Sequence, residues 1–323
     1  MPARSPRGRR KAWWRRELTL EQLVFLVNPA AGSGRAPGVW QSLVDSHPEL
    51  RAAKVVRERD PLASADALRR AIADGARGVV ALGGDGTAHM LSNLLLSDGL
   101  ADRVAMGLVP AGTGSDLCKS LGIPDAPGPA LQKALEGEPR PLDAFAVRRP
   151  GVDEPGGRPW TWCVNTVSTG VAGVVVDEVQ KLPRKGAAVY MTTTIRTLLR
   201  YRPVRCRIAV DGEPFYEGPI FLLAVANGPT FGKGMRVAPH AKVDDGLFDV
   251  VIVGDVPRWM MPLRLPQLQF GRHLGRSGVL FKQARRVRCE PLGPFTPYEL
   301  DGDMGAPGPV EVEVVPGAVR VLR

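Results

Sequence analysis

Apolar runs alternate with helical patterns along the chain as far as residue 137. Short, nearly continuous apolar runs are typical of buried strands, and apolar residues three or four positions apart are typical of helices. The expected strands are Leu23–Val27, Lys54–Val56, Gly78–Leu82 and Val104–Val109. The expected helices are Val39–His47, Ala63–Ala73, Ala88–Leu96 and Leu117–Leu121. This alternation predicts an α/β domain whose parallel sheet is covered by helices on both faces.

The pattern changes near Pro139-Arg140-Pro141, and most later apolar runs are typical of strands. Several alternate apolar with polar residues, as half-buried strands do. The expected strands are Ala144–Arg148, Thr161–Val167, Arg205–Val210, Ile220–Ala226, Leu247–Val253, Arg285–Glu290 and Val310–Val315. Helical patterns interrupt them at Val174–Arg200, with a break expected at Pro183, and at Trp259–Leu268. We therefore predict that a mostly antiparallel β-sandwich follows the α/β domain.

The N-terminal segment, residues 1–17, is strongly basic and has no acid before its last residue. Its charged and aromatic residues are Arg4, Arg7, Arg9, Arg10, Lys11, Trp13, Trp14, Arg15 and Arg16. Such a segment is expected either to be a disordered, solvated tail or to bind an anionic membrane reversibly. The sequence thus predicts an arm at 1–20, the α/β domain at 21–141 and the β-rich domain at 142–323.

Composition narrows the classes of partner. The 323-residue chain has a net charge of +10 and a pI of about 9.8, which suits nucleic acid, a nucleotide or an anionic membrane. Aromatic residues are only 6%, and no RNA-reading or zinc-finger pattern occurs, so nucleic acid is disfavoured. The four cysteines have no metal-binding spacing and are expected to be reduced thiols of a cytoplasmic protein. No apolar run approaches the roughly 18–20 residues of a membrane span.

Three glycine-rich loops, Asn28–Gly34, Gly83–Thr87 and Gly112–Asp116, each follow an expected strand. Loops after parallel strands gather at the carboxyl edge of the sheet, where ligands bind. Glycines let the backbone approach an anion, and amides at a helix N-terminus point at it. The acidic Asp85 suits such a loop if Mg²⁺ lies between it and phosphates. The loops therefore predict a nucleotide site, although neither a P-loop lysine pattern nor GxGxxG is present.

Together with motifs in the second half, these loops form an ordered set that spans the chain from about Val24 to its end. The set is Val27-Asn28-Pro29, Gly32-Ser33-Gly34, Gly83–Thr87, Pro110–Asp116, Ala226-Asn227-Gly228, Phe231–Met235, Ala238-Pro239, Asp244–Asp249 and Asp301-Gly302-Asp303. It resembles the diacylglycerol kinase and sphingosine kinase family of lipid kinases. The order and spacing are similar to those of its soluble bacterial branch.

The resemblance implies an ATP- and Mg²⁺-dependent kinase that phosphorylates a lipid hydroxyl in a cleft between the two domains. Asp301 would be the general base, and Asp85 would support the metal together with Asp116. The nucleotide would be bound by Asn28, Gly32, Gly34, Gly84, Gly86, Thr87, Gly112, Thr113, Asp116 and Asp303. A second, structural Mg²⁺ would bind Asp245 and the carbonyls of Lys242 and Leu247. Phosphate-contacting cations would lie at Lys181, Arg184 and Lys185, and the β-rich domain would bind the lipid through Val171, Val175, Tyr190 and Ile195.

Some positions depart from the family pattern. Asp303 and Met90 stand where the family usually has glutamate, and Lys233 stands inside its usual Gly-Gly-Gly. Val174 stands where sphingosine kinases carry an acid, which favours a neutral, diacylglycerol-like headgroup. His89 has no ligand spacing and is expected to be a structural or surface residue.

Two other functions stay open at this point. One is NAD kinase, although the Asn-Glu pair of that family occurs nowhere in the chain. The other is a catalytically weak homologue that binds nucleotide or membrane, which Met90 and Asp303 favour. A nucleic-acid module is not expected. We expect a cytoplasmic protein that attaches peripherally to membranes, and exposed strand edges would permit a homodimer.

Overall fold

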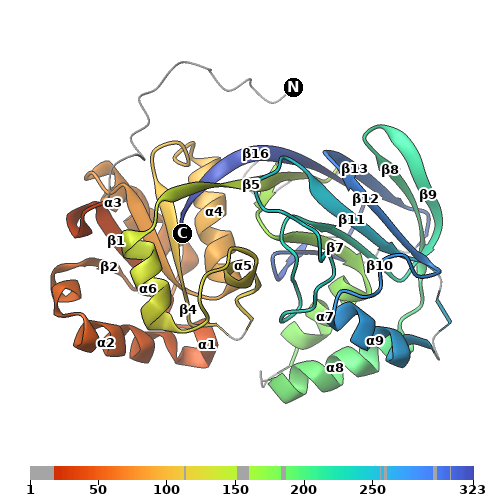
Figure 1. The fold of residues 1–323 in the computed structure, drawn as a ribbon, viewed down its shortest axis with the longest axis horizontal. Helices are drawn as coiled ribbons and strands as arrows, with labels where there is room; N and C mark the ends of the chain where they lie inside the picture. The colour runs from red at the N-terminus through yellow and green to blue at the C-terminus, as the bar shows by residue number, and fades with distance from the viewer. Residues whose placement is uncertain are drawn as a thin grey trace.

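The computed structural model describes residues 18–112, 114–150, 160–182, 187–254, 256–257, 260–293, 297–305 and 307–323 (Figure 1). Residues 1–17 of the predicted N-terminal arm lie outside these residues, as do Thr113, Arg184 and Lys185. No helix within the described part is long and apolar enough to cross a membrane.

The first domain contains the predicted parallel strands, in the order β2-β1-β3-β4. They are β1 (Leu23–Val27), β2 (Lys54–Val56), β3 (Gly78–Gly83) and β4 (Ala105–Pro110). Every residue of β1, β3 and β4 is buried, which explains their continuous apolar sequences. The helices are α1 (Ala31–Gly34), α2 (Ala36–Ser46), α3 (Pro61–Ala73), α4 (Asp85–Ser97), α5 (Asp116–Ser120) and α6 (Pro127–Glu136), with 3₁₀ turns at Leu20–Gln22 and Pro48–Ala52.

The second domain is the predicted sandwich. The first sheet continues past β4 through β16, β13, β8 and β9, and a second, antiparallel sheet with the order β12-β11-β10-β7-β14-β15 packs against this continuation. The edge-to-face pair Phe145 and Phe248, with ring centroids 5.3 Å apart, packs between them. The strands are β5 (Pro139–Arg148), β6 (Thr161–Cys163), β7 (Thr166–Gly170), β8 (Val204–Val210), β9 (Glu213–Ile220), β10 (Leu222–Ala226), β11 (Phe248–Val253), β12 (Val279–Ala284), β13 (Arg286–Pro291), β14 (Tyr298–Leu300), β15 (Asp303–Gly305) and β16 (Val310–Leu322).

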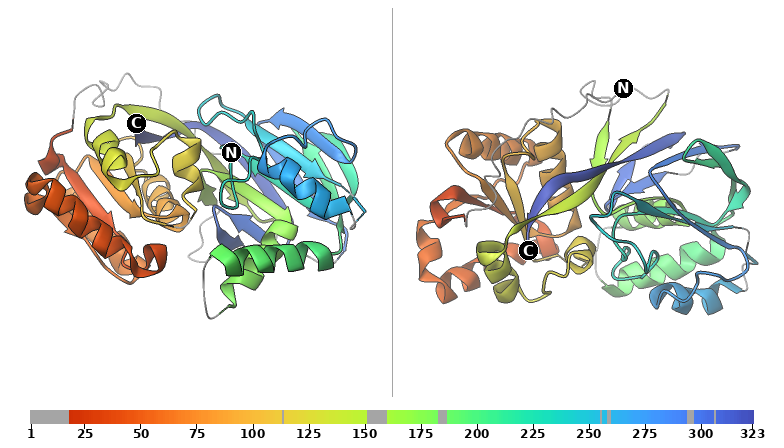
Figure 2. Two further views of the ribbon diagram at one scale, coloured as in Figure 1. Left: turned by 60° about the horizontal axis from the view of Figure 1, so that its bottom comes forward. Right: turned by 45° about the horizontal axis from the view of Figure 1, so that its top comes forward.

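Three helices cover the outer face of this antiparallel sheet: α7 (Val171–Gln180), α8 (Ala187–Arg200) and α9 (Met261–Gln269) (Figure 2). The helical pattern expected at Val174–Arg200 is therefore two helices, and α9 lies close to its expected position. The strand expected at Thr161–Val167 was wrong as a single element, because the turn between β6 and β7 divides it. That turn contributes to the site described below.

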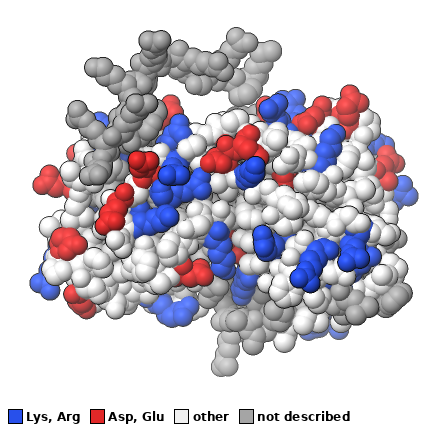
Figure 3. Space-filling view, viewed as in Figure 1, with Lys and Arg blue, Asp and Glu red and all other residues white. Residues whose placement is uncertain are grey.

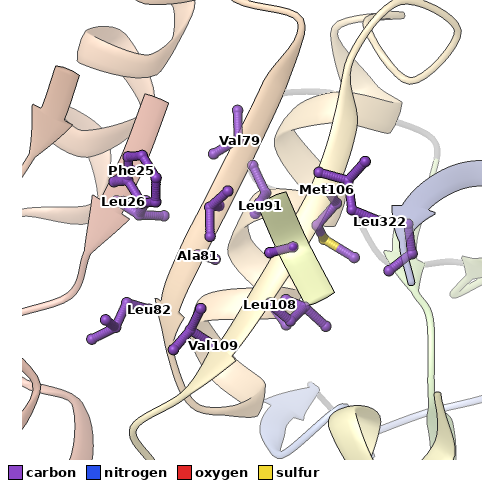
Figure 4. Close-up of a cluster of buried hydrophobic side chains, with 14 of the residues drawn as sticks. Phe25, Leu26, Val79, Ala81, Leu82, Leu91, Met106, Leu108, Val109 and Leu322 are labelled. Atoms are coloured by element: carbon purple, nitrogen blue, oxygen red, sulfur yellow. The ribbon is translucent and has the colours of Figure 1, made fainter. Parts of the chain in front are cut away.

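The last strand, β16, joins the two domains. It pairs antiparallel with β5 along the sandwich, passes a bulge between Val315 and Val319, and then pairs parallel with β4 at Arg320 and Val321. Figure 1 shows it crossing from one domain to the other. Leu322 is buried against the core of the first domain, near Met106 (Figure 4). The C-terminus of the chain thus completes the N-terminal domain, and a division at residue 142 does not separate the two sheets.

We predict that Leu322→Ala lowers the free energy of unfolding by about 2–5 kcal/mol, because it leaves a cavity in the first core. Urea unfolding measures the change. Leu62→Ala on α3 is the matched control, since Leu62 is 75% exposed, and it should change stability by no more than about 0.5 kcal/mol. Equal effects of the two substitutions would contradict a structural role for the end of β16.

Candidate active site

A cavity of ≈ 570 Å³ lies between the two domains, next to the three glycine loops that follow strands β1, β3 and β4. Its other side comes from α7, from residues 231–237 and from the turn between β14 and β15. Gly34 does not line it, and Thr113 is outside the described residues. The cavity brings together the other predicted nucleotide and catalytic residues: Asn28, Gly32, Gly84, Asp85, Gly86, Thr87, Gly112, Asp116, Asp301 and Asp303.

The glycine loops are packed too closely for side chains at two positions. A Cβ atom on Gly112 would lie 2.6 Å from the Cα of Gly84, and one on Gly32 would lie 2.1 Å from the carbonyl oxygen of Ala111. Asn28 ties the first loop to the second by donating from Nδ2 to Thr87 Oγ1 at 2.9 Å. The loops therefore form one backbone-lined wall, which suits the close approach of phosphates.

Asp85 begins α4 at the centre of this wall. Its Oδ1 accepts the backbone N–H of Leu117 at 3.1 Å. Burial, followed by the charge of Asp116, raises the pKa of Asp85 to about 6, and the charge of Asp301 acts in the same direction. A bound cation relieves this kind of repulsion between carboxylates, so the residues present fit a Mg²⁺ ion.

Asp116 connects the domains through both of its carboxylate oxygens. Oδ2 accepts the backbone N–H of Lys233, and Oδ1 accepts that of Gly234, each at 2.7 Å. Thr230 donates to the carbonyl of Asp116 at 3.3 Å. In this arrangement the third glycine loop is held by the second domain, and Asp116 has a structural role in addition to the one expected of it.

Asp301 is buried and accepts hydrogen bonds from both domains. Its Oδ1 accepts from Cys163 Sγ and from the N–H groups of residues 165 and 166, and its Oδ2 accepts from the N–H of Val164, all at 2.8–2.9 Å. His89 Nδ1, from α4, lies 3.1 Å from Oδ2. Burial alone would raise the pKa of Asp301, but His89, Cys163 and Val164 together hold it below its ordinary value. The carboxylate therefore stays ionised and is a weak base.

His89 has a larger role than its sequence suggests. It stands four residues after Asp85 and so lies one turn further along the same helix face. Burial lowers its pKa, but the hydrogen bond and charge of Asp301 outweigh burial and raise it. Next on this face, Asn93 accepts the N–H of Trp162 at 2.9 Å and donates to its carbonyl at 2.7 Å. These contacts fix α4 against β6.

Glu299 is a cavity-lining acid that sequence reasoning missed. Glu299 stands two residues before Asp301 in the chain, and this closeness was the available signal. Ser168 donates to it at 2.6 Å, and the N–H of Gly302 also donates to it. Burial raises the pKa of Glu299 to about 8, while the bonds from Ser168 and Gly302 partly oppose the shift. Glu299 is therefore a mainly protonated acid at neutral pH.

The end of the cavity away from the loops is apolar. Val171 and Val175 line it as predicted, together with Leu198, Phe221 and Phe231. Ile195 does not line it and is 44% exposed, and the side chain of Tyr190 is outside the described part of the chain.

Lys181 does not reach the cavity either. Its Nζ lies 2.5 Å from Asp177 on its own helix, and it is exposed to solvent. Lys181 is therefore not among the residues that line the cavity, and its phosphate contact stays a prediction.

The implied structural Mg²⁺ site falls on the turn before β11. Asp245 is exposed there, and its Oδ1 accepts the N–H of Leu247 at 3.0 Å. The nearby Asp249 Oδ2 is buried without a hydrogen-bond partner. Carboxylate oxygens and the carbonyls of Lys242 and Leu247 are donors that suit a hard cation. Among the described residues, no three acidic, His or Cys side chains gather closely enough to hold a metal alone, so a cation here would keep bound water.

We predict that Glu299→Gln makes the stability of the protein less dependent on pH. The native state keeps a proton that the unfolded chain, with an ordinary pKa of 4.5, releases well before pH 8. Stability should therefore fall as pH rises through this window, and the variant should lose about 1–4 kcal/mol less than wild type. Urea unfolding at several pH values measures this difference. Glu49→Gln, at an exposed position, is the control and should follow wild type.

Comparisons with known proteins agree with this geometry. Residues 22–147 match the diacylglycerol kinase catalytic domain, and residues 165–323 match the YegS C-terminal NAD kinase beta sandwich-like domain. A diacylglycerol kinase of Mycobacterium tuberculosis is 28% identical over 306 residues, which cover 94% of this chain and 95% of that protein. A YegS-like lipid kinase of Xanthomonas euvesicatoria is 33% identical over 261 residues, or 78% of this chain and 80% of that one.

A solved Bacillus anthracis structure of the diacylglycerol kinase type shares the fold. It has a TM-score of 0.72 and 22% identity, and the alignment covers 94% of this chain and 98% of the other. The family matches lie on the two domains that form the cavity, and the identity to the Xanthomonas protein extends over most of both chains. The chain belongs to the diacylglycerol kinase and YegS-like family of lipid kinases.

Proposed function

We propose that this lipid kinase uses ATP and Mg²⁺ to phosphorylate the hydroxyl of diacylglycerol or a closely related lipid alcohol. The observation that carries the proposal is the cavity itself. Glycine loops line one end, aliphatic and aromatic side chains line the other, and carboxylates also line the cavity. A nucleotide and a lipid can therefore meet at the acids between these ends, where Asp85, Asp301 and Asp303 lie.

The three loops are proposed to bind the nucleotide phosphates through backbone amides, with Asn28 and Thr87 holding two of them together. Asp85 is proposed to organise Mg²⁺, and Asp303 also lines the cavity. Mg²⁺, when bound, would neutralise part of the charge of the phosphates. A second Mg²⁺ is proposed to stabilise the turn at Asp245.

Asp301 is proposed to accept the proton of the lipid hydroxyl as that oxygen bonds to the γ-phosphorus atom. At the same time, the bond from phosphorus to the oxygen of the β-phosphate breaks and ADP leaves. In a loose transition state the new bond is weak for most of this process, so the hydroxyl needs little activation. A weak base such as Asp301 is then sufficient, provided that its position is fixed. Its hydrogen bonds with His89 and Val164 fix that position.

The apolar end of the cavity supports an acyl-chain substrate, and Val174 in place of an acid favours a neutral headgroup. Helices α8 and α9 contribute Leu198 and Leu268 to the lining of the cavity. On or next to these helices, the side chains of Ile195, Leu199 and Phe270 are 44%, 47% and 66% exposed. We propose that this surface faces the membrane when the enzyme takes up its lipid, as a peripheral protein in the cytoplasm. Exposed apolar residues of this kind commonly mark such contacts.

The alternative functions have less support. The Asn-Glu pair of NAD kinases is absent from the chain. On the face in Figure 3, basic and acidic side chains are interspersed, unlike the basic stripe of many nucleic-acid-binding proteins. Met90 packs against the first core instead of lining the cavity, so its replacement of glutamate leaves the acids Asp85 and Asp301 in position. We therefore favour an active kinase over a weak homologue.

The test of the function is phosphorylation of a substrate panel. The purified protein is incubated with ATP, Mg²⁺ and micelles containing diacylglycerol, monoacylglycerol, sphingosine or ceramide, and in a separate reaction with NAD. Mass spectrometry should detect phosphatidic acid as the main product. Phosphorylated NAD as the main product, or no phosphorylated lipid at all, would contradict the proposal.

Asp85→Asn should lower kcat for lipid phosphorylation by about 10²–10³-fold, because it removes a charge that positions the metal. The variant should be at least as stable as wild type in thermal unfolding, since burial and Asp116 disfavour the Asp85 carboxylate. Asp45→Asn, at an exposed position on α2, is the control and should keep wild-type kcat. A near-normal kcat for Asp85→Asn would exclude its proposed role.

A further inference from the structure

Lys233 has an unusual backbone conformation. It lies between two glycines in a turn where three successive residues have positive φ angles, 64° at Gly232, 68° at Lys233 and 89° at Gly234. Residues with a Cβ atom rarely adopt this left-handed conformation, because it brings the side chain against the backbone. Glycine would be more favourable here, so Lys233 carries a conformational cost at this position. Strained residues of this kind gather at functional sites.

The turn is fixed to the nucleotide wall. Its N–H groups at Lys233 and Gly234 donate to the two carboxylate oxygens of Asp116, which belongs to the third glycine loop of the other domain. Successive amides in a left-handed turn form an anion-binding concavity, and here the anion is this carboxylate. The backbone of Lys233 is therefore positioned by the same loop that is proposed to bind phosphates.

The side chain of Lys233 extends along that loop into the cavity. Its Cγ lies 4.0 Å from the place that a Cβ on Gly114 would occupy. Burial lowers the pKa of the ammonium group, and the charge of Asp116 opposes that shift. Lys119 is close by, but its Nζ donates to the carbonyl of Gly114 at 2.8 Å, and it does not line the cavity.

Lys233 differs in charge from the other ionisable residues around the cavity. The acids that line it are Asp85, Asp116, Glu299, Asp301 and Asp303. Of the described residues that line it, Lys233 alone is a lysine or arginine. A nucleoside triphosphate adds its own negative charge to that of these acids. Its terminal phosphate therefore needs a cation from the protein as well as the metal.

We propose that Lys233 binds the γ-phosphoryl group and stabilises its charge during transfer to the lipid. The inference rests on the proposed phosphoryl-transfer function and adds a phosphate-contacting residue to it. Lys233 keeps its proton throughout: the new bond joins the lipid oxygen to phosphorus, and the broken bond releases ADP. Because the turn binds Asp116, the ammonium group reaches the phosphate only while the two domains are joined.

Lys233→Gly is the decisive variant, because it removes the cation while keeping the left-handed turn and its two N–H groups. Its melting temperature should equal or exceed that of wild type, since glycine relieves the strain. Its affinity for a non-hydrolysable ATP analogue with Mg²⁺ should fall about tenfold, whereas its affinity for ADP should change less than about twofold. Lys233→Arg should retain the affinity for the analogue, and Lys54→Ala, at an exposed position on β2, controls for net charge.

With the lipid that wild type phosphorylates, Lys233→Gly should lower kcat by about 10²-fold and leave KM for the lipid unchanged. Equal affinities of wild type and Lys233→Gly for the ATP analogue, or equal losses for the analogue and ADP, would overturn the inference. The affinity measurements with the ATP analogue and ADP need no lipid. Failure of wild type to phosphorylate any lipid would instead contradict the proposed function, so the two failures can be told apart.

Discussion

The buried carboxylate of Asp301 is the interaction on which the interdomain site depends. It collects hydrogen bonds from the turn between β6 and β7 in one domain and from His89 on α4 in the other. An ionised group is costly to bury unless donors surround it, so the turn and the helix must keep their places for the fold to be stable. Asp301 itself adopts a φ of 51°, which these bonds hold in place. The same hydrogen bonds therefore both fix the geometry of the site and join the two domains.

Two similar left-handed turns lie on opposite sides of the cavity. Gly32-Ser33-Gly34 has φ angles of 61°, 60° and 88°, and Gly232-Lys233-Gly234 has 64°, 68° and 89°. The first packs against the backbone of Ala111, where only glycine fits, and the second binds Asp116. Both turns end on the third glycine loop, so each domain contributes one turn to hold it.

The sequence was sufficient for features that depend on local pattern. Strands β1 and β3 were predictable because both faces are buried, and the sandwich because its strands alternate. Strand β9 was missed because its two prolines are typical of loops, and β16 was expected to end at Pro316-Gly317, which proves to be a bulge. The family motifs identified Asp85 and Asp301 as candidate site residues. His89 and the binding of Asp116 by the Lys233 turn arise from contacts between segments far apart in the chain, which no local pattern records.

The distribution of polarity in the cavity restricts how two substrates can be bound together. Its carboxylates would repel a nucleotide that arrived without a cation, so the loop end favours a nucleotide already paired with metal. Among the described residues, the far end offers Val171, Val175 and Phe221 to acyl chains and no comparable group for phosphates. Since each end disfavours the substrate of the other, the two can occupy the cavity at once without competing. Only the lipid hydroxyl and the terminal phosphate then need to reach the acids at its centre, where the position of Asp301 is fixed by both domains.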